Sequence, residues 1–79
     1  MKEILREYIR NELLKAPNQT IHDDESLFQS QTLSTNDFIE LTIFIEEQFG
    51  TEIQGFMYGS PEVDTINNIA SVIAQMNHE

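Results

Sequence analysis

The chain has 79 residues, which is enough for one domain around a modest hydrophobic core and too few for a second domain or a deep substrate cavity. Fourteen acidic residues against four basic ones give a formal net charge of -10, which repels nucleic acid and anionic membranes and favours basic protein partners. The absence of cysteine excludes disulfides, thiolate metal sites and any thioester on a side chain of the protein itself.

The hydropathy of the chain predicts no membrane-spanning segment. No stretch reaches the roughly 20 consecutive apolar residues that a membrane-spanning helix needs. The acidic N-terminal region lacks the basic and apolar segments of a signal peptide. We therefore expect a cytoplasmic protein, and we expect residues 1–79 to form a single domain because the sequence contains no repeat and no low-complexity tract.

The first predicted element is an amphipathic helix over residues 1–16, which Pro17 ends. Its apolar residues recur at helical spacing on one face: Ile4, Leu5, Tyr8, Ile9, Leu13 and Ala16. A polar loop then extends to Leu33 and is longer than most connections in compact domains. We expect its few apolar residues to hold it against the helices, and these are Ile21, Leu27, Phe28 and Leu33.

The second predicted helix begins near Ser34 and ends at Gly50. Ser34 followed three residues later by Asp37 resembles a capping box, with Asp in place of the usual Glu. Gly50 is a natural C-terminal cap. The buried stripe of this helix is predicted from the apolar residues that recur at helical spacing, namely Phe38, Leu41, Ile45 and Phe49. Phe44 lies off this stripe and is predicted either to cover the flank that faces the short third helix or to line a crevice.

The remaining chain predicts one short helix and one longer helix. Glycine and proline between residues 50 and 64 leave room only for a minor helix around Phe56–Tyr58. Asp64 or Thr65 then caps a last helix. Its apolar face consists of Ile66, Ile69, Ala70, Ile73 and Met76. The predicted fold class is therefore all-α: a small antiparallel four-helix bundle with three long helices and one short one.

Two segments carry a resemblance to a known family. Residues 27–41 read Leu-Phe-Gln-Ser-Gln-Thr-Leu-Ser-Thr-Asn-Asp-Phe-Ile-Glu-Leu, and residues 45–53 read Ile-Glu-Glu-Gln-Phe-Gly-Thr-Glu-Ile. Both resemble acyl and peptidyl carrier proteins, and Asp64-Thr65-Ile66 followed by Ile69 is similar to the last helix of that family. The resemblance covers essentially the whole chain, and it implies a single acyl-carrier-like domain with the four-helix fold of the family.

The resemblance also implies a site for a prosthetic group. In the family, a phosphopantetheinyl transferase moves 4′-phosphopantetheine from coenzyme A to the serine of an Asp-Ser-Leu motif at the start of the second helix. The aligned residues here are Ser34-Thr35-Asn36, so Thr35 falls at the attachment position. Ser34 is the alternative acceptor if the register slips by one residue, although its spacing to Asp37 fits a helix cap better.

The variant motif has chemical consequences. Threonine keeps the hydroxyl group, but its β-branch crowds the oxygen and restricts χ1, so we expect slower loading or none. Ser34 replaces a carboxylate that helps the family's transferase and its metal ion to bind, and Asn36 replaces an apolar contact.

The resemblance further implies a docking surface on the second helix, with acidic residues around exposed apolar ones. The positions that match it are Asp37, Ile39, Glu40, Ile43, Glu46 and Glu47. The implied partners are the phosphopantetheinyl transferase and acyltransferases, synthases or adenylation enzymes with basic docking surfaces. Charges on this surface would steer such partners and would change the association rate more than the affinity.

The resulting hypothesis is a monomeric carrier that holds acyl or aminoacyl intermediates as thioesters for fatty-acid, polyketide or nonribosomal-peptide enzymes and is not itself an enzyme. The alternative is a carrier-like interaction or regulatory protein that keeps the docking surface without the prosthetic group. The run His22-Asp23-Asp24-Glu25 lacks a defined ligand spacing, so we predict an acidic loop there and no metal site. No serine belongs to a recognisable hydrolytic motif.

Overall fold

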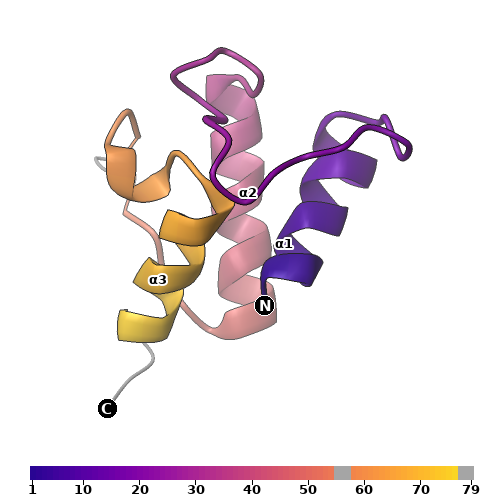
Figure 1. Ribbon diagram of the computed structural model, residues 1–79. Coiled ribbons are helices and arrows are strands. Elements are labelled where there is room, and N and C mark those ends of the chain that lie inside the picture. Colours follow the sequence, from indigo (N-terminus) through magenta and orange to yellow (C-terminus); the bar gives the residue numbers. More distant parts are fainter. Residues whose placement is uncertain (55–57, 77–79) are drawn as a thin grey trace.

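The computed structural model describes residues 1–54 and 58–76, and in these residues the chain is all-α with no strand. Helices α1, α2 and α3 are joined by a long loop and a shorter connection (Figure 1). In chain order the elements are α1 (Lys2–Tyr8), a π-helical continuation of it (Ile9–Leu13), α2 (Thr35–Phe49), a 3-10 helix (Pro61–Val63) and α3 (Ile66–Met76). The predicted helical fold class is thus confirmed.

The helices are not all antiparallel. Helix α1 runs opposite to α2 and packs against α3, whereas α2 and α3 begin at the same end of the molecule (Figure 1). Tyr58 lies beside Thr35, the first residue of α2, because the connection after Gly50 has already brought the chain back to that end. The prediction of an antiparallel bundle therefore holds for α1 and is wrong for the pair α2 and α3.

The predicted minor helix at Phe56–Tyr58 falls largely outside the described residues, since positions 55–57 are not among them. Tyr58 itself lies in a turn with Gly59, whose φ of 88° is in the left-handed region. The 3-10 helix Pro61–Val63 follows directly, and the Ser60 hydroxyl caps it by accepting from the N–H of Glu62 at 3.2 Å.

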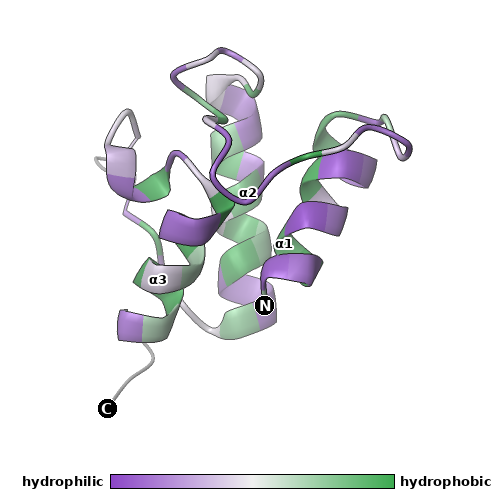
Figure 2. Cartoon of the chain, in the orientation of Figure 1, coloured by the Kyte–Doolittle hydropathy of each residue, from purple (hydrophilic) through white to green (hydrophobic). Residues whose placement is uncertain are grey.

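The core lies between the three helices and the long loop, and hydrophobic residues line the inner faces of the helices (Figure 2). The predicted stripe of α2 is confirmed for Phe38, Leu41 and Ile45, with Phe49 packed partly buried against it. The α3 face is confirmed as far as Ile73, whereas Met76 is exposed. All four loop residues expected to hold the loop are buried: Ile21, Leu27, Phe28 and Leu33.

The first helix ends earlier than Pro17. Its helical structure stops at Leu13, and the chain reverses at Lys15, whose φ of 53° lies in the left-handed region. The N–H of Ala16 then donates to the carbonyl of Arg10 at 2.9 Å, which satisfies one of the free carbonyls at the helix end. A helix-terminating turn thus forms before the proline, and the predicted boundary at Ala16 was wrong.

Both caps of α2 are confirmed. The Ser34 side chain accepts from the N–H of Asp37 at 3.2 Å, and the Asp37 carboxylate accepts from the N–H of Ser34 at 3.0 Å, which completes the capping box. At the other end Gly50 adopts φ 68°, and its N–H donates to the Glu46 carbonyl at 2.9 Å. Helix α2 therefore begins and ends where local sequence predicts.

Of the two candidate caps for α3, Thr65 performs the capping. Its hydroxyl accepts from the N–H of Asn68 at 3.0 Å. Asp64 instead points to the long loop, where its carboxylate accepts from the N–H groups of Phe28 and Gln29 at 2.8 and 2.9 Å. These hydrogen bonds fix the long loop, which leads into α2, to the start of α3.

Phe44, whose place sequence left open, stacks on Tyr8 of α1. The two rings lie 3.9 Å apart between centroids and are inclined by 10°. This contact joins α2 to α1, so Phe44 covers the flank of the core that faces α1. Among the described residues, no helix has the length and hydrophobicity to cross a lipid bilayer.

Candidate functional site

Thr35 is the first residue of α2, and its side chain is exposed. Its hydroxyl donates a hydrogen bond of 3.1 Å to the hydroxyl of Tyr58, which comes from the connection before α3. The predicted attachment oxygen therefore lies at the surface, at the N-terminal end of a helix, with Tyr58 as a side-chain partner. Sequence reasoning did not identify this partner.

Two phenylalanines hold the ring of Tyr58 in place. Phe28 from the loop and Phe38 from α2 lie with their centroids 5.9 and 5.2 Å from that of Tyr58, both in edge-to-face arrangements. They also pack edge to face on each other at 5.3 Å. Such pairs contribute about 0.5–1.5 kcal/mol each beyond the area they bury. The Tyr58 hydroxyl, which is on a side chain 40% exposed, is thus presented to Thr35 by a packed ring.

Ser34, the alternative acceptor, has a structural task. Its side-chain oxygen is the N-cap of α2 and accepts from the Asp37 N–H. Removing a serine N-cap costs about 1 kcal/mol, so a chemical group on this oxygen would weaken the start of the helix. The geometry therefore favours Thr35 over Ser34 as the acceptor. Asn36 is exposed beside them.

The predicted docking surface comprises Asp37, Ile39, Glu40, Ile43, Glu46 and Glu47, and the structure exposes five of these six side chains. Ile39 and Ile43 are 51% and 52% exposed, an unusual position for isoleucine. Asp37 is the exception, since it is half-buried and its carboxylate serves the helix cap.

Helix periodicity aligns the candidate attachment residue with this surface. Thr35, Ile39, Ile43 and Glu47 follow one another at four-residue spacing, so they form one ridge along α2. All four are exposed. The hydroxyl thus heads a ridge that continues through two isoleucines to a carboxylate.

Part of this surface borders a small pocket at the junction with α1. Its volume is about 200 Å³, and its lining consists of Tyr8, Glu40, Ile43, Phe44 and Glu47. The pKa of Tyr8 is raised, first by burial and then by the negative charges of Glu40, Glu12, Glu47 and Asp37. The raised pKa thus reflects burial first, and the acidic side chains around Tyr8 add to it.

The acidic run His22-Asp23-Asp24-Glu25 forms a turn in the long loop. The Glu25 N–H donates to the His22 carbonyl at 3.1 Å, while Asp23 pairs with Arg6 of α1. Within residues 1–54 and 58–76, no three His, Cys, Asp or Glu side chains are grouped so that they could hold a metal ion.

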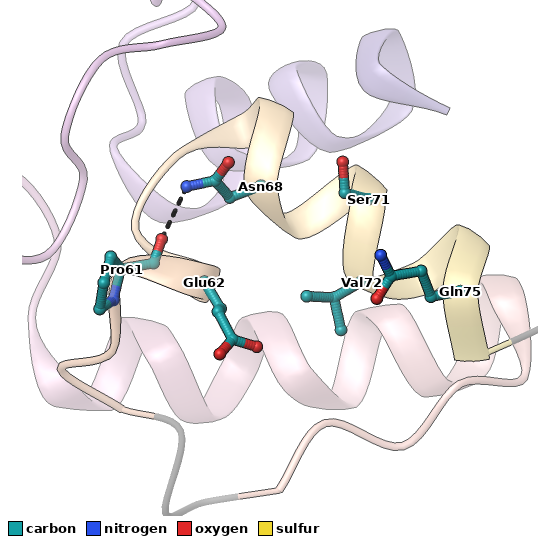
Figure 3. Close-up of a pocket in the computed structure, with 6 residues that line it drawn as sticks. All are labelled: Pro61, Glu62, Asn68, Ser71, Val72 and Gln75. Atoms are coloured by element: carbon teal, nitrogen blue, oxygen red, sulfur yellow. Dashed lines mark hydrogen bonds between the residues drawn. The ribbon is translucent and has the colours of Figure 1, made fainter.

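A second pocket lies along α3 (Figure 3). It has a volume of about 290 Å³ and is lined by Pro61, Glu62, Asn68, Ser71, Val72 and Gln75. The Asn68 side chain donates to the Pro61 carbonyl at 2.8 Å and ties the 3-10 helix to α3 at its edge. None of the predicted site residues lines it.

Comparison of the chain with protein-family models, curated proteins and solved structures finds no match in any of the three.

Proposed function

We propose that this chain is a carrier protein that holds acyl or aminoacyl intermediates on a phosphopantetheine arm attached to Thr35 and presents them to biosynthetic enzymes. The observation that carries the proposal is the exposed Thr35 hydroxyl at the head of the ridge formed with Ile39, Ile43 and Glu47. An attachment point and a partner surface on one helix face would let a single enzyme contact both. We also propose that the fold is a four-helix bundle of the acyl-carrier type.

The residues present fit the prosthetic group. A phosphodiester at Thr35 would lie at the N-terminal end of a 15-residue helix, where the partial positive charge of the first-turn N–H groups favours an anion. The Thr35 oxygen is exposed and makes its hydrogen bond to a side chain that is itself 40% exposed. When bound, phosphopantetheine supplies a terminal thiol that forms the thioester with the acyl group, a function that a chain without cysteine lacks.

In the attachment step, the Thr35 hydroxyl oxygen is the nucleophile. It forms a bond to the phosphorus next to pantetheine in coenzyme A, the pyrophosphate bond breaks, and 3′,5′-ADP leaves. A base of the transferase takes the hydroxyl proton. The β-methyl group of Thr35 limits the rotamers from which its oxygen can approach in line, which makes this step slower than with serine.

The acidic residues around the ridge would serve recognition. Glu40, Glu46 and Glu47 are exposed and attract basic enzyme surfaces over several ångströms, while Ile39 and Ile43 would contact apolar groups at short range. Because exposed charges are screened by salt, the association rate with a transferase or synthase should fall as ionic strength rises.

The second candidate is a carrier-like interaction protein that docks to the same enzymes without being modified. One observation favours it: the sequence Ser34-Thr35-Asn36 stands in place of the Asp-Ser-Leu motif of the carrier family. This protein would bind partners through the same ridge and would regulate or scaffold them.

Intact-mass spectrometry after incubation with coenzyme A, magnesium and a broad-specificity phosphopantetheinyl transferase separates the two candidates. The proposal predicts one added phosphopantetheine on the native chain and on Ser34→Ala, and none on Thr35→Ala. Loading of Thr35→Ser alone would instead favour the interaction protein, since the docking surface would then be competent and the native hydroxyl would not. Loss of the adduct only in Ser34→Ala would assign the site to Ser34.

A further inference from the structure

We propose that Tyr58 is a positioning residue for the modification of Thr35: its hydroxyl fixes the Thr35 oxygen in one rotamer and then donates to the attached phosphate. This inference rests on the proposed function. Its basis is the 3.1 Å hydrogen bond between two hydroxyls that lie 23 positions apart, in a structure that otherwise leaves Thr35 exposed.

The hydrogen bond to Tyr58 restricts the side-chain rotamer of Thr35. A threonine side chain at a helix start can place either its oxygen or its methyl group in a given direction, depending on χ1. The hydrogen bond to Tyr58 selects the rotamer in which the oxygen points to the tyrosine. A reacting oxygen held in one place loses less entropy in the reaction than one that exchanges between positions.

Modification of Thr35 changes which hydroxyl of the pair can donate a hydrogen bond. Once the Thr35 oxygen is bonded to phosphorus it has no proton to donate, so its hydrogen bond to Tyr58 cannot persist in the same sense. The Tyr58 hydroxyl keeps its own proton and is then free to donate it. Phosphate oxygens bonded to the same phosphorus are the nearest strong acceptors, and hydrogen bonds to charged phosphate are stronger than those to neutral groups.

The ring packing makes Tyr58 suited to this task. Phe28 and Phe38 both contact its ring edge to face, so the hydroxyl extends from a ring that packs against the core. A Tyr58→Phe substitution therefore removes the hydroxyl and keeps the packing. The substitution therefore tests the hydrogen bond without a large change in the stability of the fold.

A matched control exists in the same turn. The Gln29 side chain donates to the Gly59 carbonyl at 3.0 Å, which is a second tether between the loop and the Tyr58 turn that does not involve either hydroxyl. Gln29→Ala removes that tether and leaves the Tyr58 hydroxyl in place. If Tyr58 acts through its hydroxyl, Gln29→Ala should be loaded like the native chain.

The experiment measures steady-state loading of the native chain, Tyr58→Phe and Gln29→Ala by the transferase, with each substitution also made in the Thr35→Ser chain. We expect Tyr58→Phe to lower kcat by about fivefold, as for the loss of one hydrogen bond, with KM for the carrier unchanged because the docking ridge is untouched. An unchanged or higher kcat in Tyr58→Phe would overturn the inference, and so would an equal loss in Gln29→Ala.

Two spectroscopic readouts complement the kinetics, and the first of them does not depend on the transferase. Three-bond couplings from the Thr35 backbone to its methyl carbon report χ1, and we expect one rotamer in the native chain and averaging in Tyr58→Phe. The phosphorus resonance of the loaded chain should also differ between the two. If neither the native chain nor the Thr35→Ser chain is loaded, the proposed function and this inference are both wrong. Loading that is insensitive to Tyr58→Phe would defeat the inference alone.

Discussion

The Ser26 hydroxyl donates a hydrogen bond of 2.5 Å to the carboxylate of Asp64, which follows it 38 positions later in the chain. The other oxygen of this carboxylate accepts from the backbone N–H groups of Phe28 and Gln29, and the Asp64 carbonyl accepts from the N–H of Leu27 at 2.7 Å. A single buried residue before α3 thus fixes the loop that leads into α2.

Removal of the Asp64 side chain should therefore destabilise the fold. Asp64→Ala leaves the buried N–H of Phe28 and the partly buried N–H of Gln29 without their acceptor, and we expect the free energy of unfolding to fall by about 2–4 kcal/mol. Glu62→Ala removes one negative charge from an exposed position close by and should change it by less than about 0.5 kcal/mol. Urea unfolding followed by circular dichroism measures both, and equal losses in the two variants would contradict the assigned role.

The same contacts predict how acid acts on the protein. Burial raises the pKa of Asp64, but the hydrogen bonds from Ser26, Gln29, Phe28 and Leu27 outweigh it and hold the pKa below its ordinary value of 3.8. A lowered pKa in the folded state contributes stability that is fully present above the unfolded pKa and is lost as pH falls through the folded pKa.

We accordingly expect the difference in unfolding free energy between the native chain and Asp64→Asn to be constant near neutral pH. It should shrink only as the pH falls below about 4, the pKa of an aspartate in an unfolded chain. Urea unfolding at a series of pH values measures this difference. A difference that grows toward acid pH would mean that the folded pKa is raised, contrary to the geometry.

The raised pKa of Tyr8 should make the stability of the fold decrease at alkaline pH. Its pKa is raised by burial and by neighbouring carboxylates, so the folded state favours the protonated phenol. This contribution to stability is fully present below the unfolded pKa of about 10 and is lost as pH rises through the folded value. Tyrosinate absorbance in a Tyr58→Phe chain, where Tyr8 alone titrates, should give a midpoint above 10.0 that moves down with added salt. A midpoint at or below that value would contradict the prediction.

Gly50 supports α2 through its backbone conformation. Its φ of 68° disfavours residues with a Cβ, and a Cβ built there would contact no other atom within 4 Å, so only backbone strain opposes substitution. We expect Gly50→Ala to cost about 1–2 kcal/mol of unfolding free energy and Gly50→Asn to cost less, because asparagine tolerates the left-handed region. Thermal unfolding of the pair tests this, and an equal loss in both variants would point to a different cause.

The features that sequence predicted correctly are those governed by neighbouring residues. The Ser34 cap and the Gly50 terminus depend on contacts within a few residues, and the buried stripe of Phe38, Leu41 and Ile45 follows from helix periodicity. The end of the first helix was predicted less well, because a left-handed Lys15 carries no composition signal comparable to that of a glycine or a proline.

The features that sequence missed depend on tertiary contacts. Asp64 and Thr65 are both good helix caps, and only the packing of the loop against α3 assigns capping to Thr65 and loop binding to Asp64. The sequence predicts only that Tyr58 belongs to a minor helix, and it predicts no contact for its hydroxyl. Its contact with Thr35 requires the connection after α2 to return to the start of that helix, which no local pattern predicts.

The claim that Thr35 carries the prosthetic group is tested most directly by locating the adduct itself. The native chain, after incubation with coenzyme A and transferase, is digested, and the peptide that contains Ser34, Thr35 and Asn36 is fragmented in a mass spectrometer. We expect fragment ions that place one phosphopantetheine on Thr35. An adduct on Ser34, or an unmodified peptide under conditions that fully load the Thr35→Ser chain, would contradict it.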